Sequence, residues 1–163
     1  MSNVLIATTL VIAALQASYA QNCQPLDVGC CISIKTELLP RDMRTLYDWT
    51  NDHWVYMAQN TQADKSHQWK VRAKEGNNIF QFESAAFPGR CFCEKSHLSI
   101  NYGSSCECKS QEPVQLWELG GIEKGSSEVT FKRPKYEYYL YPCSDGKCVK
   151  VHWKRYEWLI QKC

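Results

Sequence analysis

The chain has 163 residues, and its 19 basic and 17 acidic side chains give a formal net charge of +2. This balance excludes the dense basic surface with which a nucleic-acid-binding protein holds a phosphate backbone. After residue 20 no apolar segment approaches the length of about 20 residues that a membrane-spanning helix requires, so we expect no membrane insertion.

The chain begins with MSNVLIATTLVIAALQASYA, in which an apolar run from Val4 to Leu15 precedes small residues at Ser18 and Ala20. This pattern is typical of a secretory signal peptide. We therefore expect residues 1–20 to be a signal peptide and residues 21–163 to form the secreted, extracellular protein. A chain of that length is typical of a single domain.

Short segments rich in β-branched and aromatic residues follow, and turn-forming sequences such as Glu75-Gly76-Asn77-Asn78 separate them. In chain order they are CISIKTEL, HWVYMAQ, QWKVRA, IFQFES, RCFCEK, LSINY, QLWEL, EVTFKR, YYLYPC, CVKVHW and EWLIQKC. Many short strands at such spacing predict an all-β barrel or sandwich. The stretch LLPRDMRTLYDWTND, residues 38–52, is helix-like, and we interpret it as a single helical turn or a long loop.

Three tryptophans recur about 40–50 residues apart, each in a segment of the same kind. Trp69 lies in HQWKV, Trp117 in QLWEL and Trp158 in YEWLI. The segments before them also align, with HWVYMA, RCFCEK and YYLYPC as second strands. We therefore expect three repeats of about four strands each, over residues 21–73, 74–121 and 122–163.

This threefold pattern, together with Gln115-Leu116-Trp117, resembles the ricin-type lectins with their Gln-x-Trp motif. The motif is complete once, because the other two units have His67-Gln68-Trp69 and Tyr156-Glu157-Trp158. The resemblance implies an all-β, disulfide-stapled β-trefoil of three four-strand repeats. It also implies that the three tryptophans are core residues, which is expected of such large apolar side chains.

All ten cysteines follow residue 20, and an even number in a secreted chain predicts disulfides. Opposed residues of an antiparallel hairpin have a constant sum of residue numbers, and Cys91 with Cys108 and Cys93 with Cys106 share one sum. We therefore predict both bonds, side by side, in a hairpin with residues 94–105 as its loop. A zinc cage completed by His97 is the alternative, but structural zinc sites space paired cysteines by two or more residues. We expect no metal and no redox chemistry there.

The remaining cysteines are Cys23, Cys30, Cys31, Cys143, Cys148 and Cys163. Asp145-Gly146 is typical of a two-residue hairpin turn, which would make Cys143 and Cys148 a closely spaced, non-hydrogen-bonded pair that a disulfide can join. In a trefoil the first and last strands are neighbours, so the resemblance implies that Cys30 or Cys31 bonds the last cysteine. Cys23 would bond the other, and the sequence leaves that choice open.

The resemblance also implies a sugar site built from an aspartate, an aromatic ring and an amide side chain within one repeat. Only the first unit carries these residue types together. They are Asp48 or Asp52, Trp54, Tyr56 and Asn60. We therefore expect a lectin-like, carbohydrate-binding module with a glycan as its partner.

A second hypothesis is an extracellular protein target. Phe87-Pro88-Gly89-Arg90-Cys91 could present Arg90 from a disulfide-braced turn to a trypsin-like protease, as an inhibitory loop does. A toxin, effector or ligand acting through a surface such as residues 132–139 is the other form of this hypothesis. The sequence contains no recognised catalytic motif, so we expect neither an enzyme nor a cofactor.

Overall fold

A computed structural model describes residues 23, 26–49, 53–59, 64–122 and 125–163. The predicted signal peptide, as well as Asp52 and Asn60, therefore lies outside the described residues. No helix within the described ranges has the length and apolar composition that a membrane crossing requires.

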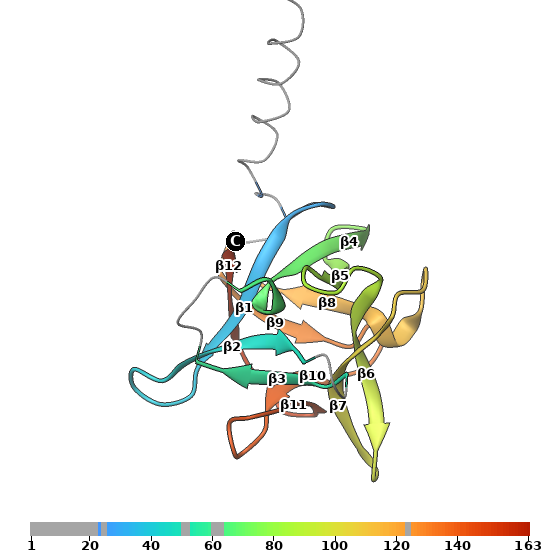
Figure 1. The fold of residues 1–163 in the computed structure, drawn as a ribbon. Helices are drawn as coiled ribbons and strands as arrows, with labels where there is room; N and C mark the ends of the chain where they lie inside the picture. The colour runs from blue at the N-terminus through green and yellow to red at the C-terminus, as the bar shows by residue number, and fades with distance from the viewer. Residues whose placement is uncertain (1–22, 24–25, 50–52, 60–63, 123–124) are drawn as a thin grey trace, which may run out of the picture.

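The described residues form twelve β-strands and two short 3-10 helices, so the protein is all-β (Figure 1). The strands are β1 Cys31–Glu37, β2 Met43–Asp48, β3 Val55–Ala58, β4 Trp69–Glu75, β5 Ile79–Ser84, β6 Arg90–His97, β7 Ile100–Glu107, β8 Leu116–Gly120, β9 Glu128–Lys132, β10 Tyr139–Pro142, β11 Val149–His152 and β12 Trp158–Lys162. The 3-10 helices are η1 Lys65–His67 and η2 Pro113–Gln115.

The strands β1, β4, β5, β8, β9 and β12 pair in an unbroken antiparallel ring, in that order and back to β1. This pairing closes a barrel. The other strands form the hairpins β2–β3, β6–β7 and β10–β11. In Figure 1 these hairpins lie away from the C-terminus, beyond the far end of the barrel.

The barrel is filled by large apolar side chains, as the sequence predicts for its three tryptophans. Trp69, Trp117 and Trp158 are fully buried. Their indole N–H groups donate to the backbone carbonyls of Leu46 in β2, Phe92 in β6 and Leu140 in β10, respectively. Each polar indole edge thus has a partner inside the core, as a buried tryptophan requires.

The prediction of a helical turn or loop over residues 38–52 is wrong, because β2 occupies Met43–Asp48. Pro40 lies in the turn that joins β1 to β2, where Leu38 and Asp42 are hydrogen-bonded through the backbone. Beyond that turn Leu46 points into the core. HWVYMA therefore supplies β3, the third strand of the chain, rather than a second strand as predicted.

The β6–β7 hairpin differs from its prediction in register but not in its disulfides. Cys91 bonds Cys108, and Cys93 bonds Cys106. The strand register instead places Cys91 opposite Cys106, so each bond joins residues offset from direct opposition by two positions. The hairpin also extends to a two-residue turn after His97, and most of the predicted loop is strand.

That turn consists of Leu98 and Ser99, whose φ angles are +48° and +65°. Positive φ at both central residues matches the right-handed twist of a hairpin, but Asn and Gly are the usual residues there. The hairpin thus ends in a tip at which the Leu98 side chain is 83% exposed to solvent.

Two of the three remaining disulfides settle the choice that the sequence leaves open. Cys31 bonds Cys163, and Cys23 bonds Cys30. Cys143 and Cys148 are also bonded, although the turn is not the predicted one. The Gly146 N–H donates to the Cys143 carbonyl, and the Cys143 N–H donates to the Cys148 carbonyl. The cysteines therefore form a hydrogen-bonded pair, and the turn is centred one residue earlier than expected.

Candidate functional site

An aromatic cleft lies where the β6–β7 hairpin meets the start of β3. Its cavity has a volume of about 230 Å³. The lining residues are Trp54, Val55, Tyr56, His97, Tyr102, Gly103 and Cys148. A Cβ at Gly103 would collide with Val149 of β11, so only glycine lets β7 and β11 pack this closely.

The β-strand periodicity brings these side chains to one face. Lys95 and His97 are two residues apart on β6, and Lys95 lies directly opposite Tyr102 of β7. The Trp54 ring meets Tyr102 edge-on at 5.6 Å and His97 at 5.9 Å between ring centroids. The Lys95 ammonium lies 5.4 Å from the Trp54 ring. The cleft thus combines aromatic surface with a cation at its edge.

A second shallow cavity, of about 290 Å³, continues the aromatic surface on the other side of Tyr56. Tyr47 and Trp49 line it together with Lys147. The Tyr47 ring lies 6.0 Å from that of Tyr56 and 5.9 Å from that of Trp49. The two cavities share Tyr56, and together they offer aromatic rings with a lysine beside each cavity. Such a surface suits a ligand with both apolar faces and hydrogen-bonding groups.

Of the sequence-predicted sugar site, the structure brings Trp54 and Tyr56 to the cleft but not the aspartate. Asp48 is only 2% exposed and accepts a hydrogen bond from the Ser105 hydroxyl at 2.8 Å. Burial raises the pKa of Asp48, against the lowering effect of hydrogen bonds from Ser105 and Ser84. The carboxylate of Asp48 therefore accepts hydrogen bonds within the protein interior and does not face the cleft, where a ligand would bind.

The arginine of the predicted inhibitory loop is also engaged. Arg90 begins β6, and its Nε donates to the Ser105 Oγ at 2.8 Å. A second guanidinium nitrogen donates to the Ser105 carbonyl. Because Asp48 binds the same serine, the two charged side chains belong to one internal network. Arg90 does not extend from the turn, as insertion into a protease pocket would require.

A larger groove of about 690 Å³ lies on the other side of the β6–β7 hairpin. Tyr136 and Tyr138, from the predicted surface of residues 132–139, line it and are 61% and 51% exposed. Lys150 and His152 of β11 complete one wall. Burial lowers the pKa of His152, as do the nearby charges of Lys150 and Lys154.

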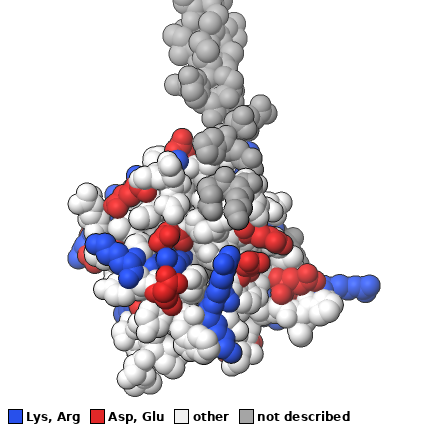
Figure 2. Space-filling view, turned by 180° about the vertical axis from the view of Figure 1, so that it is seen from behind, with Lys and Arg blue, Asp and Glu red and all other residues white. Residues whose placement is uncertain are grey.

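The two Cys-x-Cys pairs hold disulfides, so their sulfurs cannot bind a metal. Within the described residues one other group, Cys143, Asp145 and Cys148, clusters three potential metal-binding atoms. Its two sulfurs are likewise bonded to each other. On the face seen in Figure 2, basic and acidic side chains are interspersed. Recognition on that face therefore depends on local contacts rather than on a field of one sign.

His97, Tyr102 and Lys95 are the cleft residues that the sequence analysis missed. The sequence did contain an indication, because Lys95 and His97 are two residues apart and on a strand would point to the same face. All three residues fall within residues 94–105, which were predicted to form the hairpin loop, and that prediction concealed that their side chains share one face.

No family model matches the chain, and no curated protein matches its sequence. Solved structures match its fold. A mosquitocidal holotoxin aligns with a TM-score of 0.67 and 15% identity over 83% of this chain, which spans only 17% of that toxin. The BEL β-trefoil aligns with a TM-score of 0.64 and 13% identity, over 84% of this chain and 95% of its own.

Two further structures extend the comparison. The Polyporus squamosus lectin, solved with Neu5Aca2-6Galb1-4GlcNAc, aligns with a TM-score of 0.64 and 12% identity over 83% of this chain and 50% of the lectin. A Culex salivary protein of the Cysteine and Tryptophan-Rich family aligns with a TM-score of 0.62 and 20% identity over 84% of this chain and 96% of its own. These likenesses show that the fold is the β-trefoil that the sequence resemblance implies, a fold that a lectin also adopts.

Proposed function

We propose that the protein is a secreted carbohydrate-binding module whose saccharide lies in the aromatic cleft, against Trp54 and Tyr102. The observation that carries this proposal is that Trp54, Tyr102 and His97 line one cavity, with the Lys95 ammonium beside the Trp54 ring. Aromatic faces cover the apolar face of a sugar ring, and the nitrogen groups can donate to its hydroxyls.

The charge of the cleft favours an acidic saccharide over a neutral one. The Lys95 ammonium lies beside the Trp54 ring and Lys147 lines the adjoining cavity, whereas Asp48 is buried and lines neither cavity. Of the described residues that line either cavity, none is acidic. We therefore propose that a carboxylate or sulfate on the saccharide lies beside the lysines. The lectin neighbour solved with a Neu5Ac-containing saccharide is compatible with this proposal.

We also propose that the chain consists of three four-strand repeats, β1–β4, β5–β8 and β9–β12. The support is that the last strand of each unit carries a buried tryptophan near its start, whose indole N–H donates to the second strand of the same unit. Five disulfides and the salivary neighbour support secretion. The proposed activity is binding and involves no catalytic step or cofactor.

A glycan array with the protein of residues 21–163 tests the proposal. We expect binding to acidic glycans that weakens at least about 30-fold in Trp54→Ala, the loss typical of an aromatic residue central to an interface. Trp153→Ala is the matched control, because Trp153 is 66% exposed and lines neither cavity of the aromatic surface. Thermal unfolding of both variants checks that they are folded. An array without binding, or equal binding by the two variants, would refute the proposal.

A protein target is the second candidate, and the exposed tip of the β6–β7 hairpin favours it. Two disulfides brace this hairpin, and its tip presents Leu98 at 83% exposure. A hairpin braced at its base by disulfides loses less entropy when its tip binds. Cell-surface binding that survives glycosidase treatment but is lost in Leu98→Ser would identify a protein target instead of a glycan.

A further inference from the structure

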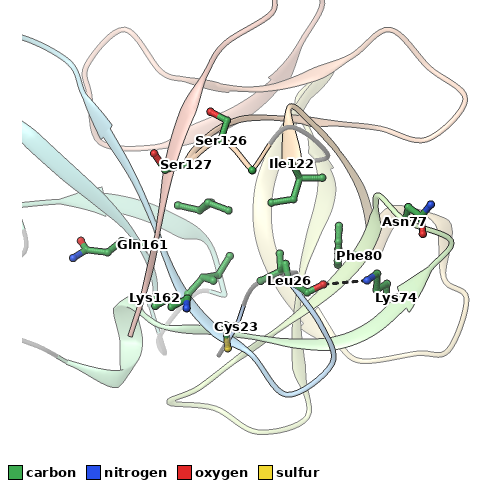
Figure 3. A pocket seen from close by; sticks show the side chains of 13 residues that line it. Cys23, Leu26, Lys74, Asn77, Phe80, Ile122, Ser126, Ser127, Gln161 and Lys162 are labelled. Atoms are coloured by element: carbon green, nitrogen blue, oxygen red, sulfur yellow. Dashed lines mark hydrogen bonds between the residues drawn. The ribbon is translucent and has the colours of Figure 1, made fainter. Parts of the chain in front are cut away.

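A cavity of about 620 Å³ lies at the end of the barrel that carries the C-terminus. It is lined by Cys23, Leu26, Ile122 and residues 125–127, together with residues of β1, β4, β5 and β12. Figure 3 shows Leu26, Phe80 and Ile122 facing one common space, whereas Gln161 points away from it. The cavity shares no lining residue with the aromatic cleft. An inference about it is therefore independent of the proposed carbohydrate site.

The floor of this cavity is apolar and continuous with the barrel core. Leu26, Ile32 and Phe80 are 5%, 2% and 1% exposed, and Ile122 and Ile160 are half-buried against the same core cluster. Its volume lies within the range of about 300–1,000 Å³ that small-molecule sites occupy. A ligand that fills it must bring an apolar portion, because a polar group buried against this floor would lack hydrogen-bond partners.

The rim of the cavity is basic. Of its described lining residues, Lys74 and Lys162 are charged and none is acidic. The Lys74 ammonium is already engaged, because it donates to the Leu26 carbonyl at 3.2 Å and to the Asp27 carboxylate at 3.1 Å. Lys162 is exposed, and no hydrogen bond or ion pair within the described residues engages its ammonium. An apolar floor below an available cation matches an amphipathic anion.

We propose that this cavity binds a small amphipathic anion, such as a fatty carboxylate, with its chain against Leu26, Phe80 and Ile122 and its head group beside Lys162. The two parts of the ligand contribute differently. Burial of the chain supplies most of the affinity, so each added methylene improves Kd about fourfold until the cavity is full. The exposed ion pair with Lys162 contributes a smaller part, about threefold in Kd, and orients the ligand.

The test is isothermal titration of the protein of residues 21–163 with straight-chain carboxylates from octanoate to dodecanoate. We expect Kd to fall with each added methylene. Lys162→Gln should weaken dodecanoate about threefold but leave dodecanol unchanged. Lys70→Gln is the matched control, because Lys70 is an exposed lysine on β4 that does not line the cavity, and it should bind as the unmodified protein does.

A second variant addresses the floor. Ile122→Glu places a carboxylate on the apolar floor, where the ligand's chain would have to desolvate it, and should therefore weaken dodecanoate at least tenfold. Circular dichroism and thermal unfolding check that this variant is folded, and Lys162→Gln tests the proposal even if it is not. A Kd that does not depend on chain length, or equal binding by Lys162→Gln and Lys70→Gln, would overturn the proposal.

Discussion

The buried ion pair between Glu94 of β6 and Arg133, which follows β9, leads to a quantitative prediction for Glu94→Gln. Arg133 is only 5% exposed, and its Nε lies 2.6 Å from the Glu94 carboxylate. Its Nη1 donates to the Leu116 carbonyl at 2.9 Å, and its guanidinium lies 5.6 Å from the Trp117 ring. These contacts hold the Arg133 guanidinium in a largely buried position at the base of the groove beside the β6–β7 hairpin.

Removing the carboxylate leaves the guanidinium charged, because arginine does not deprotonate in proteins. Burial lowers the pKa of Arg133, and Glu94 opposes that shift. Breaking one partner of a fully buried pair costs about 3–5 kcal/mol. The Glu94 side chain is 16% exposed, so we expect the lower end, about 3 kcal/mol. For a domain of this size that corresponds to a fall in Tm of about 6–12 °C.

Equilibrium unfolding in urea measures this cost, and a double-mutant cycle isolates the pair. We expect Glu94→Gln combined with Arg133→Met to be less destabilised than the sum of the two single variants, because the double variant buries no unpaired charge. The exposed pair of Arg155 and Glu157, 3.6 Å apart, provides the control. Glu157→Gln should change the free energy of unfolding by less than about 0.5 kcal/mol. A cost below about 1 kcal/mol for Glu94→Gln, or additive single variants, would refute this reasoning.

Three further predictions concern stability. Replacing Cys31 and Cys163 with alanine should lower the free energy of unfolding by about 5 kcal/mol, because their bond closes a loop of 132 residues in sequence separation. Loss of the Cys143–Cys148 bond, which closes a far shorter loop, should lower it by about 2 kcal/mol. Equal losses in urea unfolding would contradict this prediction. Ser99→Gly should stabilise the protein by about 0.5–1 kcal/mol by relieving the positive φ, whereas Ser96→Gly within β6 should destabilise it; the same sign for both changes would argue against strain in the turn. Because the pKa of Asp48 is raised above 3.8 in the folded state, the folded state binds the proton of this carboxyl more tightly than the unfolded state does. The free energy of unfolding that Asp48 contributes therefore falls as the pH rises from 3.8 through its folded-state pKa. The stability of Asp48→Asn relative to the unmodified protein should therefore increase with pH in urea titrations, and a constant difference would show that Asp48 titrates normally.

The strands and core were largely predictable because alternation and aromatic content carry that information locally. The three buried tryptophans are confirmed core residues. β2 was missed because Pro40 and the charged residues around it conceal a strand whose burial depends on Leu46 meeting the core. The local sequence pattern does not predict this contact, because neighbouring strands from elsewhere in the chain create it.

The candidate site was only partly predictable, for two physical reasons. Disulfides in a hairpin need not join directly opposed residues. The pairing of Cys91 with Cys108 was therefore predicted correctly, while the strand register predicted from it differs by two residues from the observed register of β6 and β7. The burial of Asp48 depends on Ser105 and Arg90, which come from a different part of the chain. Trp54 and Tyr56 could be identified because their side-chain chemistry is visible in the sequence itself.

The bond between Cys31 and Cys163 joins the first strand to the final residue and so makes nearly the whole chain a covalent ring. A single peptide cleavage anywhere within that ring opens it without releasing a fragment. A protease that nicks one exposed loop would therefore leave one covalent molecule, which migrates as two pieces only after reduction. A protein with this topology can tolerate a cut in an exposed loop and keep its barrel assembled.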